Sequence, residues 1–486
     1  MDPNVSRYCH IQFIFLSQEY FKFRRKYMLA LISTDSLFLS KHPDDLNLFL
    51  EIMKMIRNAL TICAFTVTMG CSNAVITDPN NDQGKNTGHF NFKPLTESAN
   101  SANWNPAAPW KLPEGFTQTV VVNESSLNIY DAGRNDWNDM NTVNETGLHA
   151  GRYMYRTHEV RGGAVSVIDL KTGETKILVQ DTNWTALDGI RWTPWGSLIF
   201  SEETTGGRLM EVILDPNNPM KALEVIDRPA VGRVAHEGLE VDNDGNVYVV
   251  DEHRGRTQGC AGITPCGGGI YKFIPDTYGD LSSGSLYVLS IKATTRRNNT
   301  GQAEWLGPID ASHGRKSGTD FGGTSYQRPE DLQIINGILY VAVTEGSRDE
   351  YGKEYYEGRV ISVDLNTLQV ADFVKPGVNV PHEIGKPGEA GHQTGFDGVD
   401  NLAESPDGRL VMIEDNIPSD IWFASTKTNK LGASKEVKLF GSLTDPEAEG
   451  TGIYFSPKDP KTLYVNVQHS VAEDGDATWA ITRNHD

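Results

Sequence analysis

Residues 235–252 read AHEGLEVDNDGNVYVVDE and predict a β-hairpin. Apolar and polar residues alternate up to an Asp-Gly pair, and an apolar run follows it. Asp-Gly between alternating apolar residues is a strong hairpin signal, because glycine tolerates the positive φ of a tight turn. The acid Glu237 opens this unit, and the acids Asp251 and Glu252 close it roughly fifteen residues later.

The same acid-to-acid layout recurs along the chain. Copies follow one another at intervals of about forty to fifty residues, some of them stretched by insertions, which is a period typical of propeller repeats. Four copies keep the spacing between the acids and a fifth is looser; they lie at residues 188–203, 237–252, 330–345, 400–415 and 449–469. Further hairpin segments lie at residues 163–173, 268–274 and 358–365.

Two hairpins in each repeat give four strands, and four-stranded units around an axis are the blades of a β-propeller. We therefore expect an all-β fold, a six-bladed β-propeller with loop insertions. A β-sandwich with acids in its turns is the alternative. A sandwich, however, needs no acid at a fixed place in every repeat.

The charge of the chain bounds its partners. The chain has 486 residues and a formal net charge of −20 at pH 7. It carries no basic stripe, which argues against a nucleic-acid partner. The acidic balance favours cations, although most of these carboxylates are expected to be solvated surface groups.

The N-terminal part of the chain differs in composition from the rest. Residues 1–52 are aromatic, mixed in charge and free of glycine. We interpret them as an extension upstream of a true start at Met53 or Met55; a genuine N-terminal extension is the alternative. Residues 53–70 combine a basic start with a short apolar stretch, which is typical of a secretory signal and too short to span a membrane.

Cys71 follows Gly70 at the end of this signal. A Gly-Cys pair in this place resembles the lipobox of bacterial lipoproteins, in which the cysteine is acylated and becomes the mature N-terminus. Residues 71–103 would then form a polar linker, and residues 104–486 the propeller. We expect an exported bacterial lipoprotein, periplasmic or anchored to the outer membrane, that touches the membrane only through its lipid.

Two cysteines lie close together in an insertion of the propeller. Cys260 and Cys266 fall within residues 253–268. In an exported protein, such a pair predicts a disulfide that closes the loop. The remaining cysteines precede Ser72, so no thiol is left for catalysis.

The repeated acids predict a metal site. The first strand of each propeller blade lines the central axis, so one acid per repeat builds a ring of carboxylates. Carboxylates that lie close together stay ionised only when cations offset their charge, and oxygen donors favour hard cations such as Ca²⁺. The candidate ligands are Asp188, Glu237, Glu330, Asp397 and Asp400 on first strands, and Glu203, Glu252, Glu345 and Glu414 on second strands.

Six groups of motifs, in order, resemble the PhoX-type alkaline phosphatase family over about residues 150–470. They are His158-Glu159 with residues 163–173; Thr193-Pro194-Trp195-Gly196 with Glu202-Glu203; His236-Glu237-Gly238; Arg328-Pro329-Glu330-Asp331; residues 396–402, FDGVDNL; and residues 451–457, TGIYFSP, with 463–469, LYVNVQH.

The resemblance implies a six-bladed propeller, export, and a phosphomonoesterase site with Ca²⁺ and iron ions on the axis. It makes Glu203, Glu237 and Glu330 metal ligands, adds Glu159 as a further candidate, and makes Arg328 the residue that binds phosphate. An arginine suits that role on its own merits, because its fork binds phosphate through two hydrogen bonds and keeps its charge.

Asp188 departs from the family pattern. The family places an iron-binding cysteine where this chain has Asp188. A site made only of oxygen donors can still hold Ca²⁺ or Fe³⁺, but it lacks the softer thiolate–iron bond. Ca²⁺ is therefore the expected cofactor, with Fe³⁺ the second candidate.

We expect a monomeric, metal-dependent phosphate-ester hydrolase that acts on a small phosphorylated substrate. One alternative is a Ca²⁺-dependent lactonase or esterase, and another is a non-catalytic surface propeller whose Ca²⁺ is structural. Arg328 favours the phosphatase, whereas the replacement of the cysteine by Asp188 favours the other two.

Overall fold

The computed structural model describes residues 90–127, 137–254, 267–295, 299–344 and 358–484. Several expectations fall outside these residues and stay predictions. They concern the extension 1–52, the signal 53–70, the lipidation of Cys71, the Cys260–Cys266 disulfide and Glu345. Among the residues that the structure describes, no helix is long and apolar enough to cross a membrane.

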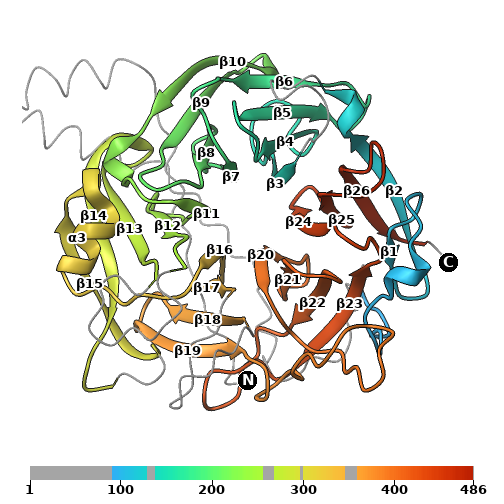
Figure 1. The fold of residues 1–486 in the computed structure, drawn as a ribbon. Coiled ribbons are helices and arrows are strands. Elements are labelled where there is room, and N and C mark those ends of the chain that lie inside the picture. The colour runs from blue at the N-terminus through green and yellow to red at the C-terminus, as the bar shows by residue number, and fades with distance from the viewer. Residues whose placement is uncertain (1–89, 128–136, 255–266, 296–298, 345–357, 485–486) are drawn as a thin grey trace, which may run out of the picture. The chain divides into compact units, whose positions relative to one another are not determined.

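The described residues form five antiparallel sheets (Figure 1). Two four-stranded sheets follow chain order: β3 (Asn138–Val143), β4 (Tyr153–His158), β5 (Ala164–Asp169) and β6 (Thr175–Gln180); then β7 (Leu187–Trp192), β8 (Leu198–Glu202), β9 (Leu209–Asp215) and β10 (Asn218–Asp227). A nine-stranded sheet contains β11 (His236–Val241), β12 (Val247–Asp251), β13 (Ile270–Thr277), β14 (Asp280–Ile291) and β15 (Gly301–Ile309), and then β19 (Gln369–Val374), β18 (Arg359–Asp364), β17 (Ile338–Val343) and β16 (Pro329–Ile335).

The last two sheets each take an outer strand from the N-terminal side of the domain. One runs β1 (Trp110–Lys111), β23 (Val437–Leu443), β22 (Asp420–Ala424), β21 (Leu410–Glu414) and β20 (Val399–Glu404). The other runs β2 (Phe116–Asn123), β26 (Ala477–Arg483), β25 (Asp459–Gln468) and β24 (Glu449–Ser456). The helical elements in the described residues are the α-helix α3 (Gly314–Asp320) and the 3₁₀ turns η3 (Ser101–Asn103), η4 (Glu124–Ser126), η5 (Pro229–Val231) and η6 (Ala311–His313).

Six strands form a closed ring at the centre of the domain. Each of β3, β7, β11, β16, β20 and β24 contacts the next, and β24 contacts β3. Figure 1 shows these strands around a common axis, with the other strands of each sheet farther out. Sheets arranged about an axis in this way make a β-propeller, as the repeats predict.

Five of the inner strands contain the same irregularity, a β-bulge after their first residue. In β11, His236 pairs with Asp251 and Leu239 pairs with Val249, so that one extra residue is inserted on the inner strand. Strands β3, β7, β16 and β20 repeat this register. A bulge bends the strand and changes the direction of a side chain. The second residue of each inner strand therefore lies where the strand bends.

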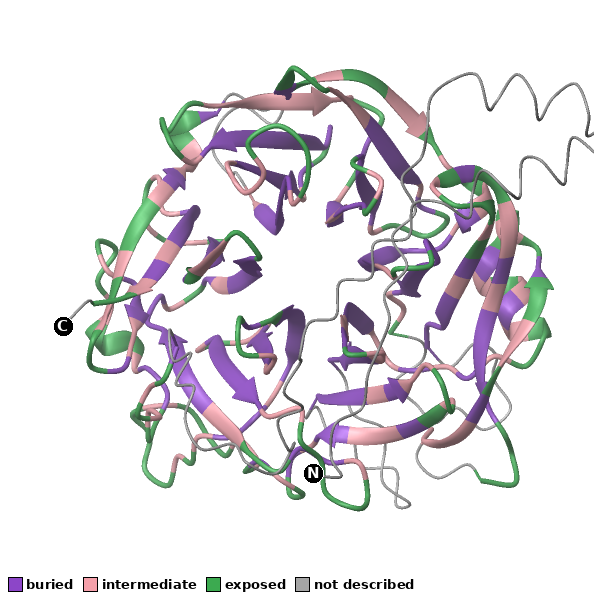
Figure 2. Ribbon diagram, turned by 180° about the vertical axis from the view of Figure 1, so that it is seen from behind, coloured by how far each residue is buried: buried purple, intermediate pink, exposed green. Residues whose placement is uncertain are grey.

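The core lies between neighbouring sheets, and burial falls off toward the outer strands (Figure 2). The N-terminal segment takes part in this core. Phe90 is 2% exposed and packs edge-on against Phe455 at 4.8 Å, and the Leu95 amide donates to the Leu439 carbonyl. The expected linker boundary at residue 103 is therefore wrong, because the packed domain already includes Phe90. The segment before residue 103 is polar on average, but its aromatic residues Phe90 and Phe92 pack against the core.

Candidate metal centre

The second residue of each bulged inner strand is a buried carboxylic acid. These acids are Asp139, Asp188, Glu237, Glu330 and Asp400. The same bulge in each strand puts these residues in equivalent places around the ring. The spacing of acids in the sequence thus reflects a repeated position in the fold.

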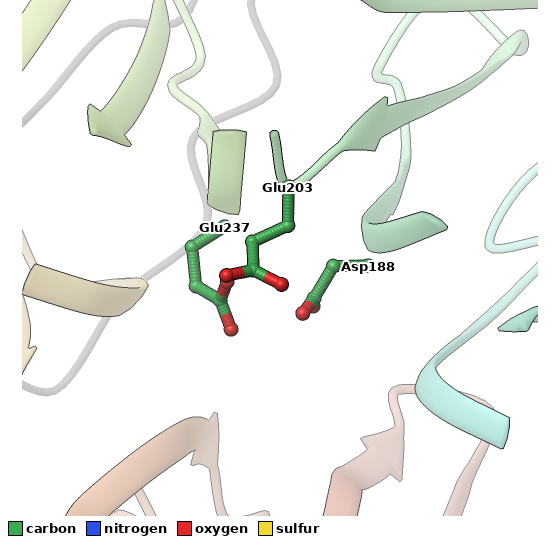
Figure 3. Close-up of side chains that lie close together, drawn as sticks. All are labelled: Asp188, Glu203 and Glu237. Carbon is green, nitrogen blue, oxygen red and sulfur yellow. The ribbon is translucent and has the colours of Figure 1, made fainter. Parts of the chain in front are cut away.

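Two groups of carboxylates come together at this level. Oxygen atoms of Asp188, Glu203 and Glu237 all lie within 4.8 Å of one another, and Figure 3 shows the three side chains converging from neighbouring strands. Oxygen atoms of Glu237, Glu330 and Asp400 form a second group with the same limit. Glu237 belongs to both groups, so the two possible cation positions are adjacent.

In three blades the second strand ends with a pair of adjacent acids, and the two acids have different tasks. The first acid of the pair accepts a hydrogen bond from the backbone where the inner strand begins. Glu202 accepts from the Thr185 amide at 3.1 Å, Asp251 from the Ala235 amide at 2.9 Å and Glu414 from the Asp397 amide at 2.9 Å, one such bond in each of three blades. These first acids hold the backbone in place.

The residue after each of these acids lies at an equivalent place in its blade, and Glu203 is the one that belongs to a carboxylate group. The amide at this place donates to the residue just before the inner strand in every bulged blade, which makes the positions equivalent: Glu159, Glu203, Glu252, Thr344 and Asp415. Glu414 was a sequence candidate, but it hydrogen-bonds the Asp397 amide and the Trp422 indole instead. Asp415 takes the place expected for Glu414. Thr344, which follows β17, has the equivalent backbone bond, and Glu345 lies outside the described residues.

Burial and mutual repulsion act together on these acids. Burial, followed by repulsion from Glu159 and Glu252, raises the pKa of Glu203 to about 9. Burial also raises the pKa of Glu330 to about 8, although Arg328 opposes this rise. Burial and then repulsion from Asp139 raise the pKa of Asp188 well above its ordinary range, and burial and then repulsion from Asp188 do the same for Glu237. A bound cation would relieve this repulsion and keep the carboxylates ionised.

Several buried oxygens in this region accept no hydrogen bond from the described residues. They are Oδ1 of Asp139, Asp188 and Asp400. Buried polar atoms are normally paired, so unpaired oxygens that face one another indicate a place for a cation. The donors are carboxylate oxygens, which suit a hard cation such as Ca²⁺. The residues present therefore fit the metal that the sequence predicts.

Arg328 lies beside these carboxylates. Its Nε atom is 2.6 Å from Glu252 Oε1 and 3.0 Å from Glu330 Oε1, and its Nη1 atom is 3.7 Å from Asp415 Oδ2. Strand β16 begins only at Pro329, so strand alternation is not what brings Arg328 and Glu330 together. Arg328 instead has a left-handed backbone, with φ of 49°.

A left-handed backbone at the position just before the inner strand recurs in several blades. Trp137, Ala186 and Gly398, which precede three other inner strands, also have positive φ. Arg328 carries a charge at this position, whereas Trp137, Ala186, Gly398 and the equivalent Ala235 do not. Among these five equivalent positions, only the one before β16 therefore carries a positive side chain, the Arg328 guanidinium.

Two other sequence candidates take different positions. Glu159 accepts a hydrogen bond from Gln468 at 3.2 Å and raises the pKa of Glu203, so it lies near the first group. Asp397 belongs to neither carboxylate group among the described residues. The part of each candidate in metal binding stays a prediction.

Asp139, Asp415 and Glu449 were missed by the sequence reasoning. Burial first, then repulsion from Asp400, raises the pKa of Asp139, and burial and Asp415 raise that of Glu449 to about 10. Glu159 gave a signal for Asp139. In the other repeats, an acid at the end of the second strand is preceded by an acid on the inner strand, so Glu159 implies an acid upstream of it. The hairpin between them lacks an Asp-Gly turn and is longer than the others, so the repeat was not recognised.

A separate cavity of about 860 Å³ is lined by the opposite ends of the inner strands. Its walls include Arg191, Glu240, Glu404 and Tyr454, and the Arg191 guanidinium pairs with Glu240. None of the carboxylates in the two groups lines this cavity. The candidate metal centre thus lies at the end of the ring where the inner strands begin.

The chain is similar to proteins of known structure. The solved structure of Pseudomonas fluorescens PhoX in complex with vanadate, described as a transition state analogue, shares 18% identity and covers 82% of this chain and 98% of its own, with a TM-score of 0.57. A gluconolactonase from Xanthomonas campestris shares 13% identity over 80% of this chain and 98% of its own, with a TM-score of 0.39. No curated protein matches the chain. The family model described as alkaline phosphatase PhoX matches residues 210–470, more than half of the 486 residues, and the chain therefore belongs to the PhoX family of alkaline phosphatases.

Proposed function

We propose that this protein is a metal-dependent phosphomonoesterase that binds the phosphoryl group of a small substrate between axial cations and Arg328. The observation that carries the proposal is the position of Arg328, a charged residue within 3.0 Å of Glu330, which itself belongs to a carboxylate group. Family membership supports phosphatase chemistry.

Asp188, Glu203 and Glu237 would hold one cation, and Glu237, Glu330 and Asp400 another. Bound cations supply Lewis acidity and offset the charge that develops on the phosphoryl oxygens. Ca²⁺ suits this donor set best, and Fe³⁺ is the second candidate because Asp188 offers oxygen where the resembling family has a thiolate. A ring of carboxylates alone would repel a phosphate dianion, so a positive charge must accompany the ligands.

Arg328 would both attract and orient the phosphate ester. Its Nε atom is engaged by Glu252, and its Nη groups, of which Nη1 lies 3.7 Å from Asp415 Oδ2, would donate to phosphate oxygens. An arginine fork matches two phosphate oxygens at once and orients the ester as well as attracting it. Glu252 and the backbone around Arg328 set the direction of this fork.

The proposal has further parts that concern the whole molecule. We assign six blades: β3–β6, β7–β10, β11–β14, β16–β19, β20–β23, and β24–β26 completed by β2, with β15 bridging β14 and β19. The protein would act as an exported lipoprotein and as a monomer, without a nucleic-acid partner.

The decisive experiment compares an aryl phosphate with an aryl lactone as substrates of the purified protein. The proposal expects hydrolysis of the phosphate ester, its loss after chelation, and its return when Ca²⁺ is added back. Metal content is measured on the same samples. Hydrolysis of the lactone alone would favour the lactonase alternative, and tightly bound Ca²⁺ with no hydrolysis of either would favour a structural role for the metal.

A further inference from the structure

Helix α3 belongs to an insertion between β15 and β16, yet it packs closely against the blade that begins with β11. Two buried glycines permit this contact. A Cβ atom at Gly314 would lie 2.7 Å from Val234 Cγ1, and one at Gly318 would lie 2.9 Å from the Tyr271 ring. A larger residue at either glycine would force the helix or the side chain it contacts to shift.

The close packing brings one side chain of the helix to Asp251. Arg315 binds the carboxylate with both arms of its fork, through Nε to Oδ2 and Nη2 to Oδ1, each at 2.6 Å. Asp251 is fully buried, and its Oδ1 atom also accepts from the Ala235 amide, which fixes the start of β11. The Nη2 atom of Arg315 also lies 3.5 Å from the Glu252 carbonyl.

The segment that Arg315 holds is the one that holds Arg328. Glu252 accepts from Arg328 Nε at 2.6 Å, and the His253 carbonyl accepts from the Arg328 amide at 3.3 Å. Residues 251–253 are therefore bound by Arg315 through Asp251 and bind Arg328 through the next two residues. Helix α3 is thus linked to the Arg328 guanidinium through direct contacts and three consecutive residues.

The neighbouring blade shows how unusual this arrangement is. The equivalent acid Glu202 is paired with Arg208, which lies only six residues away on the same blade. Asp251 receives its arginine from position 315, across 64 residues of sequence. An arginine from the same blade would be enough to neutralise Asp251. Because the arginine comes from α3 instead, the conformation of residues 251–253 depends on how α3 packs.

We propose that Arg315 is a positioning residue that fixes residues 251–253 and thereby aims Arg328 at the phosphoryl group. The inference rests on the proposed phosphatase function. Without Arg315, a fully buried carboxylate loses its counterion, and the backbone around it must move or Asp251 must take up a proton. A displacement of about 1 Å in a group that orients a substrate costs on the order of 100-fold in rate.

The test compares Arg315→Ala, Arg315→Lys and Gly318→Ala with the wild type in the full chain. Arg152→Ala is the matched control, because Arg152, just before β4, makes a similar two-armed pair with Asp169 at the end of β5 in another blade. For each protein, kcat and KM on an aryl phosphate, inhibition by inorganic phosphate, calcium content and thermal unfolding are measured. Gly318→Ala keeps Arg315 and only displaces the helix.

We expect Arg315→Ala to lower kcat/KM by about 10- to 100-fold and to weaken inhibition by inorganic phosphate, with calcium content unchanged. Arg315→Lys should restore part of the loss, because an ammonium keeps the charge but not both contacts. Gly318→Ala should fall in the same direction, and Arg152→Ala should match the wild type.

Three results would overturn the inference. In the first, Arg315→Ala and Gly318→Ala retain wild-type kinetics and phosphate inhibition while the wild type is active; this leaves the proposed function intact. In the second, calcium and activity are lost together, which would place the role of Arg315 in the metal site. A wild type that hydrolyses no phosphate ester would overturn the proposed function and this inference with it. If Arg315→Ala does not fold, Arg315→Lys and Gly318→Ala decide.

Discussion

Replacement of Arg328 by alanine should separate phosphate binding from metal binding. Arg328 contacts Glu330 and Glu252 but is not itself a metal ligand. Its removal takes a positive charge away from the carboxylate ring, so cations lose a competitor for the same negative charge. We therefore expect Arg328→Ala to retain its calcium in saturating Ca²⁺ at alkaline pH.

The loss of activity is expected to be large. Removing one preorganised electrostatic donor from a site of this kind costs about 2–4 kcal/mol of transition-state stabilisation, or about 30- to 1,000-fold in kcat/KM. The side chain of Arg328 is 20% exposed and Glu330 is 1% exposed, so solvent cannot replace the lost charge fully. Arg328→Lys should recover only part of the loss, because lysine cannot make the two-armed contact.

Glu330→Ala provides the contrasting variant. Glu330 belongs to the second carboxylate group, so its loss should remove metal and activity together. Wild type, the three variants and the Arg152→Ala control are assayed on an aryl phosphate and an aryl lactone, with metal analysis of the same preparations. Unchanged phosphate-ester turnover in Arg328→Ala would refute the assignment of Arg328. So would a parallel loss of calcium in that variant.

Three further predictions follow from the chain. Cys71 should be the acylated N-terminus of the mature protein, and mass spectrometry of membrane-extracted protein should show a diacylated or triacylated Cys71 peptide and no peptide from residues 1–52. Because the pKa of Glu203 is raised to about 9, this carboxyl stabilises the cation-free protein most below about pH 4.5, and its contribution is lost as the pH rises toward 9. Saturating Ca²⁺ should abolish this slope. Unfolding temperatures measured with chelator or with Ca²⁺ decide, and an equal slope in both would contradict the prediction. Asp139→Ala should lower the number of bound calcium ions while the fold is retained, and an unchanged metal content would exclude Asp139 from the site.

The propeller was accessible from the sequence because its inner hairpins repeat a local pattern. Strands β8, β12, β17, β21 and β25 all lie where an apolar run follows a turn in the repeats. The inner hairpin of the first blade escaped notice, since β3 and β4 are joined by a longer connection without an Asp-Gly turn. The aromatic anchor Phe90 escaped as well, because its partners Phe423, Phe440 and Phe455 lie more than three hundred residues away.

The convergence of Asp188, Glu237 and Glu330 was also accessible, since one acid per repeat must form a ring in a closed fold. The environment of Arg328 was only partly accessible. Its nearness to Glu330 follows from a left-handed turn at the start of the blade and from Glu252 on the neighbouring blade. A contact between blades leaves no periodic trace in the sequence.

The pairs of acids that close the hairpins show where sequence patterns stop being informative. Glu414 and Asp415 are adjacent acids of similar chemistry, and the pattern does not say which of them belongs to the metal centre. The structure distinguishes the two acids through backbone pairing. The Asp415 amide bonds to the Gly398 carbonyl, as the Glu252 amide bonds to that of Ala235, while Glu414 is drawn to the Asp397 amide. The bulge near the start of the inner strand sets this offset, so the position of the bulge, rather than the acid itself, selects the ligand candidates.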